Sequence, residues 1–163
     1  MAEKKFQSWH PVVGARPMEK ALDFYVDWLG FQLDSEWEEA PGEPRLAWIS
    51  RDGLEIALNE DPDIKTTVWL NINVADAQAF ADEWNERRPG SVEVVSGEPY
   101  EFPAIYLMDP FGNHIHIQQM SKDVEAARRE RMPEMREFIK QRLAEGKPVP
   151  SPEEIAAASS RNR

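Results

Sequence analysis

The feature that most constrains the fold of this chain is an internal repeat, because residues 1–120 contain two copies of one pattern offset by 59 positions. Gly53 of the first copy corresponds to Gly112 of the second, and Ala57 corresponds to His116. Apolar residues spaced i, i+3, i+4 and i+7 predict one face of an amphipathic helix in each copy. They are Met18, Ala21, Leu22 and Tyr25, which the offset carries onto Ala77, Phe80, Ala81 and Trp84. So long a period is typical of a duplicated module, whereas a solenoid needs three or more units.

Each copy is expected to consist of a strand, a helix and three further strands. Pro17 suits the first helical turn, Gly30 suits the residue after the helix end, and Asp52-Gly53 predicts a hairpin turn. The expected ranges are 9–15, 17–29, 31–36, 45–51 and 54–59 in the first copy and 66–74, 75–88, 92–96, 105–108 and 114–119 in the second. These elements predict an α+β fold of two tandem βαβββ modules, about 8–60 and 66–120, in one domain of residues 1–120.

Alternating side chains indicate which face of each strand is turned away from the helix. The strand 68–74 alternates aliphatic residues with Trp69, Asn71 and Asn73, and the last strand alternates isoleucines with His114 and His116. The aliphatic residues are expected to pack against the helices, and Trp84 completes a helix face and is expected in the core. The pattern does not fix the face of Trp48. The opposite, concave face then carries the candidate site residues His10, Glu55, Ala57, Trp69, Asn71, His114 and His116.

Composition and charge narrow the class of partner. Residues 1–120 contain nine Lys/Arg and twenty-two Asp/Glu, a net charge of −13, whereas residues 121–163 contain ten and eight, a net charge of +2. A body this acidic repels phosphate backbones, so we expect no nucleic-acid partner and a preference for a cationic small molecule.

No apolar run is long enough to span a bilayer, and the first residues lack the apolar segment of a secretion signal. We therefore expect a cytoplasmic protein without a membrane partner. The chain has no cysteine, which excludes disulfides and sulfur-ligated zinc.

Two motifs resemble the vicinal oxygen chelate superfamily, which comprises glyoxalases, bleomycin-resistance proteins and extradiol dioxygenases. They are Phe24-Tyr25 with Leu29-Gly30-Phe31, and Asp109-Pro110-Phe111-Gly112-Asn113, and both fall in the register of the repeat. The resemblance covers about residues 8–120. It implies paired βαβββ modules, each curving a mixed sheet around a concave site, commonly in a homodimer.

The metal enzymes of that superfamily place their ligands on the first and last strands of each module. Carried over to this chain, those positions are His10, Ala57, Trp69 and His116. Ala57 cannot bind a metal, and Trp69 offers only an N–H donor. A stable site normally takes three or more protein ligands, so the resemblance implies no resident cofactor. A divalent metal held by His10 and His116, with Glu55 as a third ligand, is the remaining metal hypothesis.

His116, where the metal enzymes have a glutamate, resembles the bleomycin-resistance branch, whose members are small acidic dimers that sequester a drug without chemistry. The resemblance implies a homodimeric binding protein for a cationic or aromatic antibiotic-like molecule. Its grooves would be lined by His10, Glu55, Trp69, Asn71, His114 and His116. A metal-dependent lyase, isomerase or dioxygenase is the alternative function, and a carrier or regulatory module is a third hypothesis.

Residues 121–163 lie beyond the resemblance and predict a helical C-terminal extension. Ser121 is expected to cap a helix that ends near Arg131, because Pro133 would interrupt it. A second helix, with apolar residues between 135 and 143, would end at Gly146. Pro152 would open a short third helix after the linker 147–150. We expect the extension to pack on the body or on a partner subunit.

Overall fold

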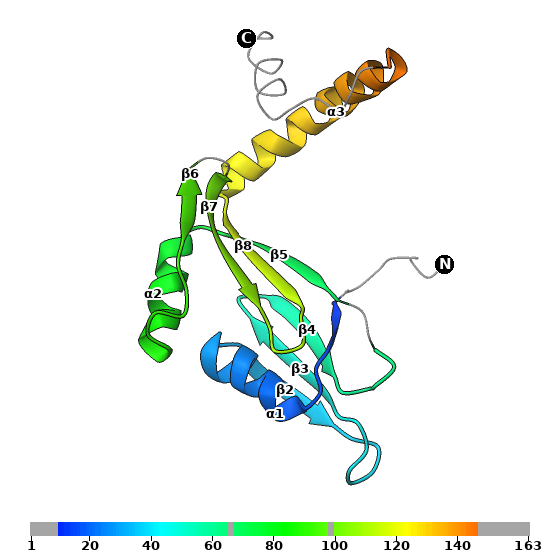
Figure 1. The fold of residues 1–163 in the computed structure, drawn as a ribbon, viewed down its shortest axis with the longest axis vertical. Coiled ribbons are helices and arrows are strands. Elements are labelled where there is room, and N and C mark those ends of the chain that lie inside the picture. Colours follow the sequence, from blue (N-terminus) through cyan, green and yellow to red (C-terminus); the bar gives the residue numbers. More distant parts are fainter. Residues whose placement is uncertain (1–9, 65–66, 98–99, 147–163) are drawn as a thin grey trace, which may run out of the picture. The chain divides into compact units, whose positions relative to one another are not determined.

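The computed structural model describes residues 10–64, 67–97 and 100–146 (Figure 1). The chain divides into two compact units, Met1–Gln119 and Met120–Arg163. The first unit contains both copies of the repeat, and each copy forms an open four-stranded sheet of its own. The expected α+β fold of two βαβββ modules is confirmed.

The first module has the strand order β1-β4-β3-β2, with β1 parallel to β4 and the other neighbours antiparallel. Its strands are β1 (Val12–Gly14), β2 (Gln32–Trp37), β3 (Leu46–Arg51) and β4 (Leu54–Asn59). The helix α1 (Met18–Leu22) continues as a π-helical segment, η1 (Asp23–Trp28). The amide of Leu29 bonds to the carbonyl of Phe24 at 3.0 Å, the i→i+5 spacing of a π-helix. In this wider turn Phe24, Tyr25 and Trp28 are all buried.

The second module repeats this connectivity with the strand order β5-β8-β7-β6. Its elements are β5 (Trp69–Val74), α2 (Ala77–Arg87), β6 (Val95–Gly97), β7 (Tyr100–Met108) and β8 (His114–Gln119). The helix α2 begins two residues later than expected because Asp76 is its N-cap and accepts a hydrogen bond from the Ala79 amide at 3.1 Å.

Three strands of the second module differ from the sequence-based expectation, and the first of them, β5, begins at Trp69 rather than at residue 66. β7 begins at Tyr100 rather than at residue 105, and β6 covers Val95–Gly97 rather than 92–96. The described pairing of β7 with β8 starts at Ala104, so residues 100–103 extend beyond it on the side of β6. Pro103 lacks an N–H group and is tolerated there because it needs no partner in β8.

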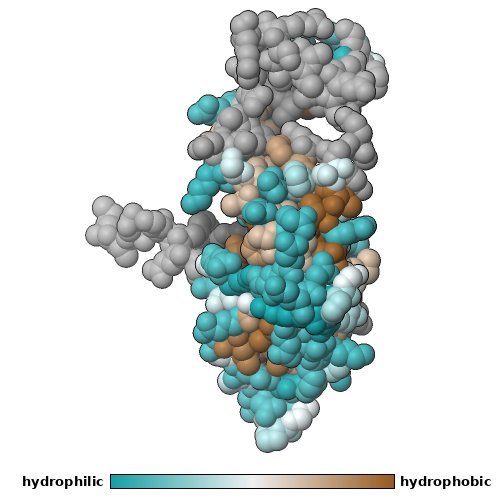
Figure 2. All heavy atoms as spheres, turned by 90° about the vertical axis from the view of Figure 1, so that its left-hand side faces the viewer, coloured by the Kyte–Doolittle hydropathy of each residue, from teal (hydrophilic) through white to brown (hydrophobic). Residues whose placement is uncertain are grey.

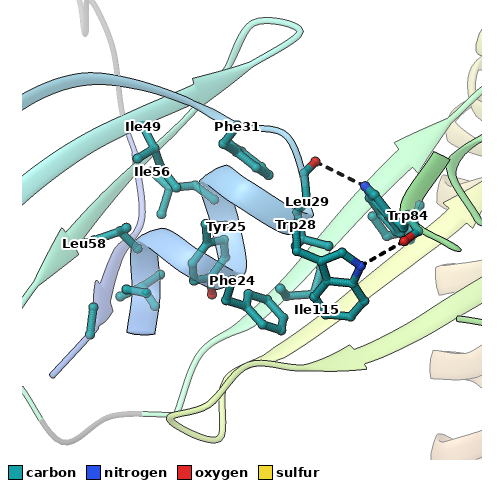
Figure 3. Packing of buried hydrophobic residues seen from close by; sticks show 14 of the residues in the cluster. Phe24, Tyr25, Trp28, Leu29, Phe31, Ile49, Ile56, Leu58, Trp84 and Ile115 are labelled. Carbon is teal, nitrogen blue, oxygen red and sulfur yellow. Dashed lines mark hydrogen bonds between the residues drawn. The ribbon is translucent and has the colours of Figure 1, made fainter. Parts of the chain in front are cut away.

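The helices of the two modules pack together and bury one shared hydrophobic core (Figure 3). The Trp84 side chain is 2% exposed, which confirms its expected place in the core. Its indole Nε1–H donates to the Leu29 carbonyl at 3.1 Å, and the Trp28 Nε1–H donates to the Trp84 carbonyl at 3.2 Å (Figure 3). Both large rings are therefore buried without an unsatisfied donor.

Charged side chains join the modules around this core. Arg51 Nη2 lies 2.7 Å from Glu83 Oε2, and Arg88 Nη2 lies 2.8 Å from Asp23 Oδ1. The guanidinium of Arg51 also lies 4.9 Å from the centroid of the Phe80 ring. These pairs cross from one copy of the repeat to the other, so they favour a single arrangement of the two modules.

The Asp109–Asn113 turn is a buried polar junction between the modules. Asp109 is 4% exposed, and its carboxylate accepts hydrogen bonds from the amides of Phe111 and Asn113 and from the Tyr25 hydroxyl, the last at 2.8 Å. The Asn113 side chain donates to the Gly14 carbonyl at 3.3 Å and accepts from the Val68 amide at 3.0 Å. The turn thus fixes the start of β8 against both β5 and the first module.

In the described part of the second unit, residues 120–146, the helix α3 (Lys122–Ala144) is continuous, where the sequence predicted an interruption at Pro133. The expected break is wrong because proline already has a helical φ and forfeits one backbone hydrogen bond, while the flanking Arg, Glu, Met and Ala residues favour helix. α3 ends before Gly146, whose φ is +71°. The third expected helix lies outside the described residues. No described helix has the length and apolar character needed to cross a membrane.

The side of the molecule on which α2 lies is largely hydrophilic, with smaller separate apolar areas (Figure 2). This agrees with the outer residues of α2, which are exposed and polar or small: Gln78, Ala79, Asp82, Glu86 and Arg87. The helices therefore shield the core on this side, and most large exposed apolar side chains of the first unit lie elsewhere.

Candidate ligand-binding face

The second sheet turns a row of polar and aromatic side chains away from the helices. Strand register places Trp69 beside His114 and Asn71 beside His116 on the parallel strands β5 and β8. On the other side of β8, His116 pairs with Tyr106 and His114 with Met108. Four of the six predicted site residues, Trp69, Asn71, His114 and His116, are therefore neighbours on one face.

Two ring pairs are stacked on this face. The Trp69 and His114 rings lie with centroids 4.2 Å apart and planes 14° from parallel. The Tyr106 and His116 rings lie 4.5 Å apart and 9° from parallel. Neighbouring pairs of parallel rings present planar π surfaces, which suit contact with a planar or cationic ligand.

His116 is held in one orientation by a side-chain hydrogen bond. Its Nδ1 lies 3.0 Å from Asn71 Oδ1. Because an amide oxygen only accepts, Nδ1 carries the proton and Nε2 is the acceptor of the neutral ring. Burial lowers the pKa of His116 below its usual value, so the ring is neutral at physiological pH.

This face is open to solvent. Trp69 is 61% exposed, Tyr106 is 50% exposed and Met108 is 60% exposed. Sequence reasoning missed Tyr106 and Met108 as members of the face. The alternation in residues 105–108 separates them from Ile105 and Leu107, but placing them beside the histidines required the register of β7 against β8.

In the first module, His10 meets Trp48 rather than another polar group. The two rings meet edge to face with centroids 4.2 Å apart. Trp48 is paired with Ala57, which is only 1% exposed and leaves room for the large ring beside it. The Nδ1 atom of His10 is buried and has no hydrogen-bond partner among residues 10–64, 67–97 and 100–146. Glu55 is exposed and lies opposite Ser50.

Trp48 therefore belongs to the face away from the helices, which the sequence did not establish. Its counterpart in the second module is Tyr106, because each is paired with the residue at the equivalent position of the last strand, Ala57 or His116. The offset between these two aromatic residues is 58 rather than 59. Two residues join β3 to β4, whereas five residues join β7 to β8. With the longer turn, the pairing of β7 with β8 is shifted by one residue relative to the pairing of β3 with β4.

The four positions that correspond to metal ligands in the superfamily do not fit a metal centre in this chain. Ala57 has no donor atom, and Trp69 is stacked on His114. The remaining donors are His10, which precedes β1 of the first module, and His116, on β8 of the second, and they contact Trp48 and Tyr106. Within the described residues, no three or more His, Asp or Glu side chains form a group that could hold a metal ion.

Two cavities in the first unit lie apart from this face. One of about 390 Å³ is lined by residues between Gly14 and Asn113, and one of about 290 Å³ by residues between Phe31 and Ile117. None of the six predicted site residues lines either cavity. A ligand held by the stacked rings would therefore bind on an open surface unless another molecule covers it.

The sequence profile described as "Glyoxalase superfamily protein" matches residues 1–124. The chain belongs to the glyoxalase superfamily. The family resemblance of the two sequence motifs is thereby confirmed. No curated protein matches the chain.

Solved structures share the glyoxalase-superfamily fold at low sequence identity. The bleomycin-binding protein of bleomycin-producing Streptomyces verticillus, complexed with copper(II)-bleomycin, has a TM-score of 0.53 and 22% identity, with 73% of this chain and 100% of that chain covered. TnmS3, an antibiotic binding protein from Streptomyces sp. CB03234, has a TM-score of 0.52 and 24% identity, with 70% and 97% covered. A glyoxalase/bleomycin resistance protein/dioxygenase superfamily member from Sphaerobacter thermophilus has a TM-score of 0.50 and 22% identity, with 71% and 98% covered.

Proposed function

We propose that this protein binds and sequesters a cationic or aromatic antibiotic-like molecule on the open face of its second sheet. The observation that carries the proposal is the pair of neighbouring ring stacks, Trp69 with His114 and Tyr106 with His116. Asn71 orients the His116 ring and adds a hydrogen-bonding group between the stacks. Aromatic side chains with a few oriented polar groups are the usual lining of a small-molecule site.

The charge of the protein favours a cationic ligand. Residues 1–120 carry a net charge of −13, which raises the local concentration of cations around the body. The Trp69 and Tyr106 rings of the face offer π surfaces to a cation. Two solved structures of the same fold are those of an antibiotic binding protein and a bleomycin-binding protein, which supports this ligand class.

A second subunit would convert the open face into a groove. We propose a homodimer in which His10 and Glu55, of the first module, lie in the same grooves as the aromatic face of the second sheet. Binding in these grooves would need no bond to be made or broken, which accords with the incomplete set of metal ligands.

Bleomycin titration by isothermal calorimetry tests the proposal, since bleomycin is a cationic glycopeptide with planar rings. We expect saturable binding at micromolar concentrations. Trp69→Ala should weaken binding about five- to thirtyfold, because stacking on an aromatic ring contributes roughly 1–2 kcal/mol. Trp69→Phe, which keeps a ring, should recover part of the affinity.

Leu33→Ala is the matched control, because Leu33 is exposed but pairs with Ile49 on the helix side of the first sheet. It should bind like the parent protein. Absence of heat at high micromolar bleomycin would reject that ligand. An equal loss of affinity in the Trp69 and Leu33 variants would reject the stacked-ring face as the binding site.

Metal analysis of protein purified without chelator tests the alternative, a metal-dependent enzyme. About one metal ion per chain, lost in His116→Ala, would favour the enzyme.

A further inference from the structure

The cavity of about 290 Å³ lies between the two modules, on the other side of the second sheet from the stacked rings. Its inner wall is buried and apolar: Phe31 is 8% exposed, Trp84 2% and Ile117 4%. The wall is continued by half-buried apolar side chains, those of Ile72, Val74 and Phe80. The mouth is formed by exposed residues, which are Asp52, Leu54, Asn73 and Ala75.

The internal repeat places an equivalent cavity in the other half of the unit. Both cavities lie where the first strand of one module meets the last hairpin turn of the other. Residues Gly14, Ala15, Arg16, Phe111 and Asn113 line the larger cavity, and their repeat partners Asn73, Val74, Ala75, Asp52 and Leu54 line the smaller one. A hollow at this place is therefore a feature of the duplicated module rather than a local packing defect.

The two cavities differ in chemistry at the hairpin turn. In the larger one, the buried Asn113 side chain bonds to the Gly14 carbonyl across the module boundary. In the smaller one Leu54 takes the place of Asn113, and a leucine makes no such bond. The exchange leaves this cavity with a predominantly apolar lining that includes three aromatic rings, those of Phe31, Phe80 and Trp84.

The single cation of the lining is already neutralised. The Arg51 guanidinium lies 2.7 Å from a Glu83 oxygen and 3.5 Å from an Asp52 oxygen, and it also donates to the Leu29 carbonyl. Because Arg51 has these partners, the cavity offers no unpaired charge to an ionised ligand. An uncharged ligand avoids the cost of removing an ion from water.

The size of the cavity sets the size of the ligand. An engineered apolar cavity of about 150 Å³ binds benzene. A cavity of about 290 Å³ is about twice as large and accommodates a bicyclic ring system. We propose that the space enclosed by Phe31, Ile72, Phe80, Trp84 and Ile117 is a second binding site, for a small uncharged aromatic molecule of up to about two fused rings.

Indole is the probe for this site. The reporter is the Trp84 Nε1–H resonance, because Trp84 lines the cavity and its Nε1–H is held by the hydrogen bond to Leu29. We expect a saturable shift of this resonance when indole is titrated into the full-length protein. Ala75→Phe, at the exposed mouth, should weaken indole binding at least tenfold by filling the cavity. Leu54→Phe, which approaches from the first module, should have the same direction of effect.

Ala79→Phe is the matched control, because Ala79 is exposed on α2 and does not line the cavity. It should leave the indole affinity within about twofold of the parent. Trp69→Ala should also leave the Trp84 shift unchanged, which separates this site from the proposed antibiotic face. Absence of a saturable shift up to the solubility of indole, or equal affinity in the Ala75→Phe and Ala79→Phe proteins, would overturn the proposal.

Discussion

At the scale of single residues, the stretch from Asp109 to His116 has two separate tasks. Asp109 and Asn113 are buried, and their side chains satisfy backbone amides and the Tyr25 hydroxyl. His114 and His116 follow immediately and lie on the open face, stacked on Trp69 and Tyr106. The turn therefore positions the two imidazoles and takes no part in the face itself.

Because the Tyr25 hydroxyl is buried against Asp109, the free energy of unfolding should fall at alkaline pH. Burial, and then the neighbouring Asp109 carboxylate, raise the pKa of Tyr25 above its usual value of about 10. A raised pKa in the folded state contributes stability below about pH 10 that is lost as the pH rises further. In Tyr25→Phe we expect a loss of about 1 kcal/mol at pH 7 and a weaker decline above pH 10, measured by urea unfolding.

Tyr106→Phe is the control for that measurement, because Tyr106 is 50% exposed. It should leave the stability at pH 7 and its alkaline decline close to those of the parent protein. If both variants had the same alkaline decline as the parent, the buried Tyr25 hydroxyl would not be its source.

The contact in which His116 Nδ1–H donates to Asn71 Oδ1 should make the protonation of His116 sensitive to the side chain at position 71. Burial lowers the pKa of His116, so its NMR titration should have a midpoint below about 6.5. A carboxylate opposite Nδ1 would stabilise the imidazolium, so Asn71→Asp should raise the pKa of His116 by about 1 unit or more. Asn73→Asp, one step further along the same face of β5, should raise it less. Equal shifts in the two variants would contradict the specific contact.

At the scale of elements, Trp84 of α2 makes two hydrogen bonds to the first module. Trp84 donates its Nε1–H to Leu29 and accepts the indole N–H of Trp28 at its own carbonyl (Figure 3). Trp84 corresponds to Tyr25 in the 59-residue repeat. Tyr25 is also buried, and its hydroxyl donates a hydrogen bond to Asp109 of the other module. At this position of the repeat, each copy thus supplies a buried aromatic residue that bonds to the other copy.

Replacing Trp84 by phenylalanine should destabilise both modules together. The change removes the donor to Leu29 and part of a buried ring, so we expect a loss of about 2–3 kcal/mol in the free energy of unfolding. Chemical denaturation followed by circular dichroism should show a single transition shifted to lower denaturant. Trp37→Phe, at a side chain that is 59% exposed, should change stability by less than about 0.5 kcal/mol. Two separate transitions would contradict the shared core.

At the scale of the whole molecule, the first unit exposes apolar side chains mainly on the sheet faces that turn away from the helices. Val12 and Trp37 lie on that face of the first sheet, and Trp69, Tyr106 and Met108 on that of the second, with exposed fractions from 43% to 61%. A large exposed apolar surface on a soluble domain marks an interaction site. The proposed homodimer would cover it.

Light scattering coupled to size-exclusion chromatography should therefore give twice the mass of the 18.8 kDa chain. The double variant Trp37→Glu with Met108→Glu should elute as a monomer, because it places charges in the apolar contact. Leu33→Glu, on the helix side, should remain dimeric. A parent protein that is monomeric at high micromolar concentration would contradict the dimer, and deletion of residues 121–163 would show whether the extension contributes to it.

The sequence by itself determined the modules, because duplicated helix and strand periodicities report burial directly. It placed β4 and β8 at their observed bounds, Trp84 in the core and the two histidines on the face away from the helices. Asp109 and Asn113 were visible as a motif, but their hydrogen bonds to Tyr25 and Gly14 join residues 84 and 99 positions apart. Local patterns carry no information about partners at such separations.

Only the tertiary structure decided which side chains meet. Strand register, displaced by one residue through the longer turn after β7, brought Tyr106 to His116 and Trp48 to Ala57. Packing of the modules through their helices created the apolar cavity beside Trp84. Register and module packing depend on turn geometry and on contacts between distant segments, whereas alternation along a strand depends only on neighbouring residues.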